Sequence, residues 1–283
     1  MGNQVREDDM AGGHESDAVF AESVPEFYDR YLVPLLFKTY ADDLAARVAS
    51  SHPSSLLEVA AGTGVVTRAL CAQLPPSVAI TATDLNQPMV DHAMSVGTSR
   101  PVDWRAADVM SLPFSDAGFD VVVCQFGAMF FPDRAAAFAE VARVLRPGGV
   151  FLFNVWDRIE RNEFANVISK ALGGVYPDDP PMFLARTPYG YYDETAIRAD
   201  VAAAGFATPI GFEALEAESR APSCDIPAFA YCQGTPLRNE IEARDPKGLV
   251  EATEAAAAAI GKHFGQTDIT AKIRAFVISA TKP

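Results

Sequence analysis

A turn of small residues follows an apolar run that contains one acidic side chain. The stretch "LLEVAAGTGVVT" places Glu58 inside the run, and Gly62 and Gly64 in the turn after it. Small side chains let a ligand approach the backbone closely, and the first N–H groups of a helix beginning near Gly64 would point into the same space. The turn therefore predicts a ligand site. It does not distinguish dinucleotides from other nucleosides, nor either from a tight turn without a ligand.

Asp84 strengthens the prediction of a nucleoside site. It closes the second apolar run, 22 residues after Gly62. A carboxylate at this place accepts hydrogen bonds from ribose hydroxyls in folds that bind nucleosides beside a glycine turn. Asp84 would also suit the start of the helix predicted from Gln87, and the two roles are compatible.

Asp108 narrows the class of cofactor. It follows the third apolar run, in "WRAADVMSLPF". A carboxylate there can accept a hydrogen bond from the amino group of adenine, and the N–H of Val109 can donate to a ring nitrogen. Nicotinamide enzymes do not generally need an acid at this point, and their third glycine would fall at Thr67. A nicotinamide-dependent oxidoreductase is therefore the weaker alternative.

The elements that must position these residues alternate between strands and helices. Near-continuous β-branched and aromatic runs, separated by helical patterns, favour a parallel sheet covered on both faces, with ligands beyond the carboxyl ends of its strands. The predicted strands are residues 56–60, 77–83, 102–106, 119–125, 150–156, 206–219 and 269–280. The predicted helices are residues 24–50, split at Pro34, then 64–74, 87–96, 134–145 (ended by Pro147-Gly148-Gly149), 163–172 and 193–204.

The composition argues against nucleic acid, membranes and metals as partners. The formal net charge is −14, so the chain would gain nothing from neutralising the phosphates of nucleic acid or anionic lipid. The four cysteines include no C-x-x-C pair, which predicts neither a zinc site nor a disulfide framework. No apolar run approaches the ~20 residues of a membrane span, and the acidic N-terminus is the reverse of a signal peptide. We expect a cytoplasmic protein that binds no metal. The sequence does not indicate its oligomeric state.

Four stretches together resemble the class I S-adenosylmethionine-dependent methyltransferases, in the group that includes the ubiquinone/menaquinone C-methyltransferases. They are "LEVAAGTGVVT", "ATDLNQPMV", "AADVMSLPFSDAGFDVVVCQFGAMFFPD" and "RVLRPGGVFLFNVW", within residues 56–157. The resemblance, looser beyond that range, implies an α/β fold. This is a Rossmann-like, doubly wound sheet of about seven strands, mostly parallel with the last strand antiparallel, plus helical cap insertions. S-adenosyl-L-methionine is the implied cofactor.

The resemblance also assigns roles to individual residues. Glu58 matches the family acid that organises the turn and the cationic amino-acid end of the cofactor, and Asp84 matches the ribose acid. Ala60 replaces the usual first glycine, which is expected to shift the methionine portion rather than abolish binding. The implied adenine contacts are Leu85, Asp108 and Val109, and the implied methionine contacts are Gln125, Phe126 and Gly127. The complete predicted cofactor-binding set is Tyr28, Glu58, Ala60, Gly62, Thr63, Gly64, Asp84, Leu85, Met89, Asp108, Val109, Gln125 and Phe126.

Two irregular blocks interrupt the alternation after residue 157. Both are expected near the strand ends where a ligand binds, as a mobile cap over the acceptor. The predicted organisation is a disordered tail over 1–22, an S-adenosylmethionine-binding core with N-terminal helices over 23–157, a cap insertion over 158–190, the core continued over 191–224, a helical insertion over 225–265 and the last strand over 266–283.

Methyl transfer needs mainly proximity, orientation and exclusion of water, so no catalytic base has to be present in the sequence. His92 is expected on the surface. His263, at the end of the alanine-rich helix, is placed either to face a substrate or to act as a cation at the helix C-terminus. A small, largely apolar or aromatic acceptor is expected to contact Met182, Phe183, Tyr191 and Tyr192. The alternative to an enzyme is a non-catalytic protein on the same fold that binds the cofactor or a partner.

Overall fold

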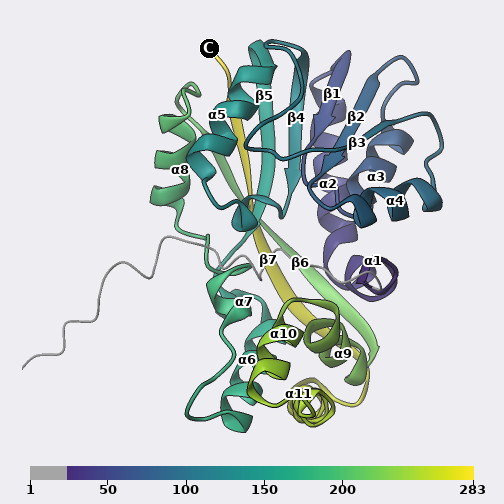
Figure 1. Cartoon of the computed structure of the whole chain (residues 1–283), viewed down its shortest axis with the longest axis vertical. Coiled ribbons are helices and arrows are strands. Elements are labelled where there is room, and N and C mark those ends of the chain that lie inside the picture. The colour runs from purple at the N-terminus through teal and green to yellow at the C-terminus, as the bar shows by residue number, and fades with distance from the viewer. Residues whose placement is uncertain (1–23) are drawn as a thin grey trace, which may run out of the picture.

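The computed structural model describes residues 24–283; the tail predicted over residues 1–22 lies outside this part of the chain. Within it, seven strands form one sheet in the order β3-β2-β1-β4-β5-β7-β6 (Figure 1). Neighbouring strands from β3 to β5 are parallel, and β7 is antiparallel to both β5 and β6. The predicted fold class is confirmed. The strands are β1 (Ser55–Glu58), β2 (Ala79–Asp84), β3 (Asp103–Ala106), β4 (Phe119–Gln125), β5 (Leu145–Trp156), β6 (Gly211–Ser223) and β7 (Thr267–Thr281).

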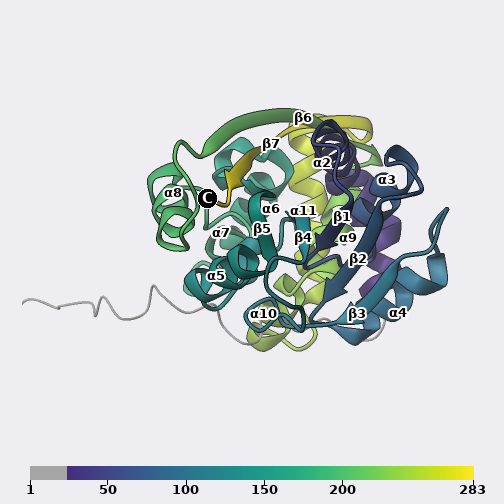
Figure 2. The ribbon, with the colours of Figure 1, turned by 90° about the horizontal axis from the view of Figure 1, so that it is seen from above.

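Side chains alternate across the sheet and create a separate apolar core on each face. Leu56 and Leu57 are both fully buried, but they point to opposite faces because successive strand residues do so. The first packs with α2 (Lys38–Ser50) and α3 (Val65–Gln73), and the second faces the core that α5 (Arg134–Val144) and α8 (Glu194–Ala203) complete. Figure 2 places these two helix pairs on either side of the sheet. α4 (Gln87–Val96) packs beside β2 and β3.

The strand order reverses between β1 and β4. From β1 the chain winds outward to β2 and β3, then returns to add β4 and β5 on the other side of β1. In parallel sheets this reversal leaves a crevice at the carboxyl ends of the two central strands, where ligands bind. Glu58 ends β1 and Gln125 ends β4, so two predicted cofactor residues border the crevice.

A layer of helices covers the carboxyl ends of the strands. Beyond the last pair with β5, between Trp156 and Ala275, strands β6 and β7 continue together as a two-stranded ribbon into this layer (Figure 1). The layer contains α6 (Glu163–Val175), α7 (Phe183–Arg186), α9 (Asp225–Gly234), α10 (Leu237–Arg244) and α11 (Leu249–Phe264). Its helices come from both irregular blocks, and they pack on one another.

Several predicted boundaries are wrong. The N-terminal helix is not split at Pro34: α1 (Val24–Phe27), a π-helical stretch η3 (Tyr28–Phe37) and α2 follow without a break. The wider π turn accommodates a proline, which has no N–H to donate and would crowd an α-helical turn. Pro147-Gly148-Gly149 lies inside β5, where the Gly148 N–H donates to the carbonyl of Lys282. No helix in the described residues is long and apolar enough to span a membrane.

Candidate functional site

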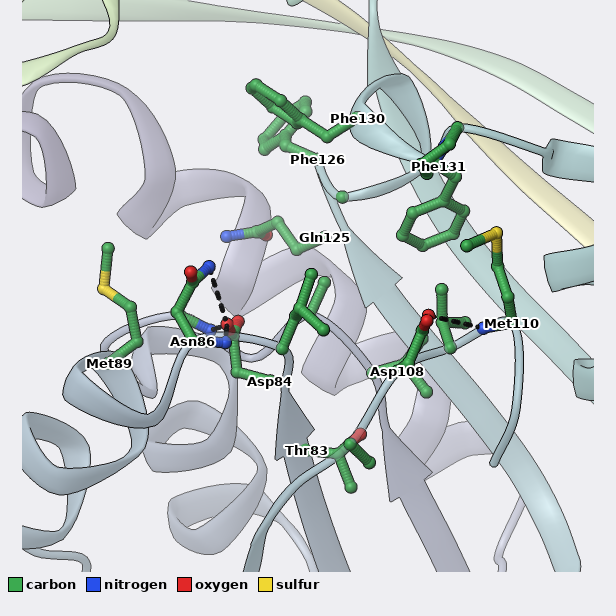
Figure 3. A pocket seen from close by; sticks show the side chains of 18 of the residues that line it. Thr83, Asp84, Asn86, Met89, Asp108, Met110, Gln125, Phe126, Phe130 and Phe131 are labelled. Atoms are coloured by element: carbon green, nitrogen blue, oxygen red, sulfur yellow. Dashed lines mark hydrogen bonds between the residues drawn. The ribbon is translucent and has the colours of Figure 1, made fainter. Parts of the chain in front are cut away.

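A pocket of about 170 Å³ opens at the crevice between β1 and β4 (Figure 3). The loops after β1, β2, β3 and β4 all contribute to its wall, as the resemblance implies. Ten of the thirteen predicted cofactor residues line it: Tyr28, Ala60, Gly62, Asp84, Leu85, Met89, Asp108, Val109, Gln125 and Phe126.

The other three predicted residues lie behind the glycine turn. Glu58 and Thr63 line a smaller cavity of about 30 Å³, which shares Tyr28 and Gln125 with the main pocket. Gly64 lines neither cavity. Its φ is +83°, and a Cβ there would lie 2.8 Å from the Trp104 ring, so this glycine is required by the turn and by packing.

The glycine turn combines an open position with a strained one. Gly62 has φ +56°, and no atom lies within 4 Å of the place a Cβ would occupy, so the backbone there faces open space. Ala60 adopts φ +53°, a left-handed conformation that an L side chain adopts at a cost of about 1–3 kcal/mol. Where the family has glycine, this chain therefore carries both a methyl group and backbone strain.

Asp84 holds the turn in shape. One carboxylate oxygen accepts the Gly62 N–H at 2.8 Å, and the other accepts the Asn86 N–H at 2.9 Å. Burial raises the pKa of Asp84, and these backbone hydrogen bonds oppose the rise. Because each carboxylate oxygen has two lone-pair sites, Asp84 retains capacity to accept from a ligand.

Glu58 is buried beside the smaller cavity. Its carboxyl accepts the Thr67 hydroxyl at 2.6 Å, and its exposed fraction is 1%. Burial raises the pKa of Glu58 to about 8, so at neutral pH the side chain is mostly protonated. A cation bound in this cavity would favour the ionised form.

The opposite end of the pocket suits a flat ring. Asp108 accepts the Met110 N–H at 2.9 Å, which fixes the loop that carries Val109 (Figure 3). Leu85 is 61% exposed at the rim, while Met89 is buried. An apolar rim beside a fixed carboxylate is the arrangement that the resemblance implies for adenine.

Gln125 provides a specific test of fit for the cofactor. It lines both the main pocket and the smaller cavity, and its side-chain nitrogen lies 3.4 Å from the Phe37 carbonyl. Its Oε1 is buried and has no hydrogen-bond partner among the described residues. Leaving a buried acceptor unpaired costs about 1–3 kcal/mol. The ammonium group of the cofactor's methionine end would supply the missing donor.

Asp29 is a site residue that sequence reasoning missed. The Thr63 hydroxyl and the Arg68 guanidinium each donate to one of its oxygens at 3.0 Å, and His92 Nε2 lies 3.7 Å from the other. His92 is therefore half-buried beside the pocket region, not on the open surface as expected. The cluster fixes η3, and with it the neighbouring Tyr28, against the glycine turn.

A second cavity, of about 80 Å³, adjoins the main pocket. Tyr28, Phe126 and Phe130 line both spaces. The remaining walls come from η3, from the turn after β4, from the end of β5 and from the helical layer. They are Leu32, Leu36, Phe37, Met129, Trp156, Phe183, Leu184, Pro188, Tyr189, Tyr231, Thr235 and Pro236.

Of the four residues expected to contact an acceptor, one lines the second cavity. Phe183 lines the second cavity, but Met182 and Tyr192 are 47% and 38% exposed and line neither cavity. Tyr191 also lines neither cavity, and its hydroxyl donates to Asp200 at 2.7 Å. His263 is exposed at the end of α11 and lines neither space.

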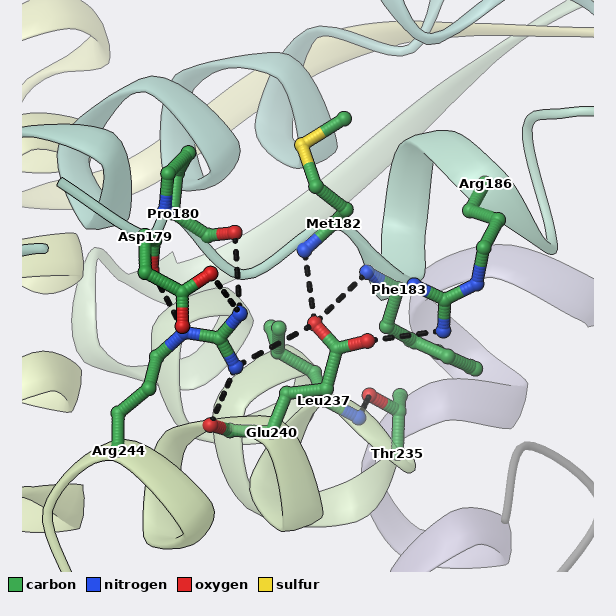
Figure 4. Close-up of polar contacts among 9 residues, drawn as sticks. All are labelled: Asp179, Pro180, Met182, Phe183, Arg186, Thr235, Leu237, Glu240 and Arg244. Carbon is green, nitrogen blue, oxygen red and sulfur yellow. Dashed lines mark hydrogen bonds and ion pairs between the residues drawn. The ribbon is translucent and has the colours of Figure 1, made fainter. Parts of the chain in front are cut away.

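Glu240 joins the two irregular blocks at the edge of this cavity (Figure 4). From α10, its carboxylate accepts the N–H groups of Met182 and Phe183, at 2.7 and 3.1 Å, and the Arg186 guanidinium at 2.8 Å. It therefore satisfies N–H groups at the start of α7 and fixes the segment that carries Phe183. Arg244, one turn along α10, donates to Asp179 at 3.0 Å.

Comparison with known proteins agrees with this geometry. Residues 57–153 match the family model described as a methyltransferase domain. The chain is 31% identical over 149 residues to a ubiquinone/menaquinone biosynthesis C-methyltransferase of Dinoroseobacter shibae, covering 51% of this chain and 59% of the relative. It is 30% identical over 142 residues to a malonyl-[acyl-carrier protein] O-methyltransferase of Hahella chejuensis, covering 50% of each.

Solved structures extend the likeness of the fold to nearly the whole chain. An S-adenosylmethionine-dependent methyltransferase from Thermotoga maritima, described as a possible histamine N-methyltransferase, superposes with a TM-score of 0.54 at 15% identity. The match covers 93% of this chain and 97% of that one. At this identity the likeness concerns the fold alone.

These findings define the class. The match over residues 57–153 assigns a methyltransferase domain to this chain, and together with the curated relatives it bears out the resemblance to class I S-adenosylmethionine-dependent methyltransferases and the cofactor that the resemblance implies. The chain spans about half the length of the two curated relatives described above.

Proposed function

We propose that this protein transfers a methyl group from S-adenosylmethionine to a small-molecule acceptor bound in the aromatic cavity. The observation that carries the proposal is the shared wall: Tyr28, Phe126 and Phe130 border both the cofactor pocket and the second cavity. A molecule in the second cavity would therefore lie directly beside the cofactor. The names of the curated relatives cover both quinone biosynthesis and an acyl-carrier protein, so this cavity is the better guide to the acceptor.

In the proposed complex, different pocket residues contact different parts of the cofactor. Asp84 accepts from the ribose hydroxyls, while Asp108 and the Val109 N–H contact the adenine that packs on Leu85. Gln125 Oε1 and Glu58 receive the ammonium of the methionine end beside the open position at Gly62. Each polar assignment places a carboxylate, amide or backbone group of the chain opposite a group of complementary charge or hydrogen bonding.

The protein's part in the chemistry is orientation and exclusion of water. S-adenosylmethionine supplies a methyl group on a positively charged sulfur, which an acceptor atom can displace in line. The aromatic walls hold the acceptor against the cofactor pocket and keep water out of the reacting space. The tyrosines of the cavity do not serve as bases, because burial raises the pKa of Tyr28, Tyr189 and Tyr231.

The helical layer is proposed to act as the cap over the acceptor. Phe183 and Leu184 come from one irregular block, and Tyr231 and Thr235 from the other. The carboxylate of Glu240 ties the two blocks together at this wall. The acceptor would enter when this layer, or η3 with Tyr28, moves away from the sheet.

Calorimetry and turnover together test the proposal. The full chain should bind S-adenosylmethionine and S-adenosylhomocysteine and should not bind NAD. With labelled S-adenosylmethionine, some member of a panel of neutral ring compounds should acquire the label. Binding of NAD without a response to either sulfur compound would support a nicotinamide enzyme. Cofactor binding with no turnover across the panel would favour the non-catalytic alternative.

A further inference from the structure

We propose that the paired hydroxyls of Tyr189 and Tyr231 bind one oxygen atom of the acceptor. The site would thereby select uncharged, largely apolar ring compounds that carry a hydrogen-bond-accepting oxygen. The inference rests on the proposed methyl transfer and specifies its substrate class.

The walls of the second cavity disfavour a charged ligand. None of the described residues that line it is ionisable near neutral pH; they are aromatic, aliphatic or hydroxyl-bearing. A charged group placed here would lose its water without gaining a counter-ion, and its transfer would be strongly unfavourable. A carboxylate, phosphate or ammonium on the acceptor would therefore weaken binding sharply.

Most of the cavity is shaped for a flat ring. Phe126 and Trp156 stack with their ring centres 3.9 Å apart and their planes 5° apart, and Tyr189 lies 5.9 Å from Trp156. Phe126 is held at φ +50°, with its N–H directed at both the side-chain and backbone oxygens of Asn154, at 2.9 and 3.2 Å. These hydrogen bonds fix the backbone of Phe126, so the aromatic wall offers a rigid surface to an apolar ring.

The hydroxyl groups in the wall differ in what they can still offer. The Thr235 hydroxyl is already used, because it donates to the Tyr231 carbonyl at 2.7 Å and accepts the Leu237 N–H at 3.2 Å. The Tyr40 hydroxyl, near this region, donates to the Leu215 carbonyl. Neither hydroxyl has a proton left to donate to an oxygen of a ligand.

Tyr189 and Tyr231 have one proton left over. Their hydroxyl oxygens are 3.0 Å apart, and both side chains are buried. Two hydroxyls carry two protons, yet one hydrogen bond between them uses only one. Among the described residues no acceptor is recorded for the second proton. A buried O–H without an acceptor costs about 1–3 kcal/mol, so an oxygen on the ligand would remove that cost.

The two tyrosines also join the two irregular blocks. Tyr189 follows α7 and Tyr231 lies on α9, so their hydroxyl pair forms only when the helical layer is assembled. An acceptor oxygen bound to the pair would therefore be recognised by the closed form of the cap.

Matched single-ring probes test the inference without knowledge of the natural acceptor. The full chain is saturated with S-adenosylhomocysteine and titrated with acetophenone, ethylbenzene and benzoate, which differ at one substituent. Acetophenone should bind about fivefold or more tightly than ethylbenzene, the effect of one buried hydrogen bond. Benzoate should bind more weakly than either.

The variants Tyr189→Phe, Tyr231→Phe and the double variant identify the group responsible. Either remaining hydroxyl can still donate, so the preference for acetophenone should persist in at least one single variant and disappear in the double variant. Tyr192→Phe, an exposed tyrosine outside both cavities, is the matched control and should keep the preference.

The affinity for S-adenosylhomocysteine is measured for every variant and should stay unchanged. The inference is overturned if benzoate binds as well as acetophenone, if no probe binds the loaded wild type, or if the double variant retains the preference. In each of these cases cofactor binding would remain and the proposed methyl transfer would survive. Failure of the wild type to bind S-adenosylhomocysteine would instead overturn the proposed function, and this inference with it.

Discussion

The carboxylate of Asp29 lies 3.0 Å from the hydroxyl of Thr63 and joins the N-terminal helical segment to the glycine turn. Arg68 completes the junction, because its guanidinium donates both to Asp29, at 3.0 Å, and to the Thr63 carbonyl, at 2.7 Å. The residue next to Asp29 is Tyr28, which borders both the proposed cofactor pocket and the proposed acceptor cavity. One ion pair thus fixes the position of a side chain that separates two proposed ligands.

Replacing Asp29 by alanine should weaken S-adenosylhomocysteine binding about three- to tenfold, since a partly exposed ion pair and one hydrogen bond are worth about 1 kcal/mol. Isothermal titration measures the change. The matched control is Asp43→Ala: Asp43 and Arg47 form an ion pair of similar exposure, 26% and 28%, against 22% and 28% for Asp29 and Arg68. Equal affinities in the two variants would contradict a role for Asp29 in the pocket.

Asp84→Ala should weaken cofactor binding by roughly 2–4 kcal/mol, because ribose hydroxyls and the Gly62 N–H lose a charged acceptor together. Asp108→Ala should weaken it less, since adenine keeps the Val109 backbone contact. Calorimetry on both variants gives the order. Two variants that bind like the wild type would show that the pocket is assigned wrongly.

The pH dependence of stability should report the buried Glu58. Its pKa rises from 4.5 in the unfolded chain to about 8 in the folded one, so between these values the folded state holds the extra proton. The stabilising contribution of the protonated form is complete below pH 4.5 and is lost as pH rises toward 8. In chemical unfolding of the ligand-free protein, Glu58→Gln should flatten this decline. A decline as steep as that of the wild type would mean that another group causes it.

Ala60→Gly should leave the free energy of unfolding unchanged or raise it by up to about 2.5 kcal/mol. Removing the left-handed strain gains about 1–3 kcal/mol, and the added chain entropy of glycine opposes it by about 0.5–1 kcal/mol. Cofactor affinity should stay equal or increase, because a methyl group leaves the pocket wall. Ala61→Gly is the control: Ala61 is not among the residues with positive φ and should only lose stability. If denaturant unfolding shows the same loss of stability in both variants relative to the wild type, the backbone at Ala60 is not strained.

The sequence predicts those site residues that lie within a few positions of the end of one strand. Asp84 and Asp108 each follow a recognisable apolar run, so their place at the crevice follows from the alternation of strands and helices. Asp29 and Thr63 are 34 residues apart, and Tyr189 and Tyr231 are 42 apart. Their contacts depend on how helices pack over the sheet, which no local pattern encodes. The same reason explains why the sequence favours Tyr191 and Tyr192 as acceptor contacts, although it is the neighbouring Tyr189 that lines the second cavity.

Glu240 offers the sharpest test of the cap, because it acts at a distance from the cofactor pocket. Its carboxylate is the acceptor for the Met182 and Phe183 N–H groups, so Glu240→Ala leaves the start of α7 without its partner. The Phe183 wall of the acceptor cavity should then loosen. Turnover should fall about tenfold or more, while cofactor affinity stays within about tenfold, ~1.4 kcal/mol.

Hydrogen exchange tests the role of Glu240 without requiring that the methyl acceptor be identified. The amides of Met182 and Phe183 should exchange faster in Glu240→Ala than in the wild type, with the sheet unaffected. Glu242→Ala is the matched control, since Glu242 lies on the same helix and pairs with Arg238 on the exposed face. If the Phe183 amide exchanges equally in both variants, Glu240 does not fix the α7 segment. The proposed acceptor cavity would then owe its shape to the packing of its aromatic and aliphatic walls alone.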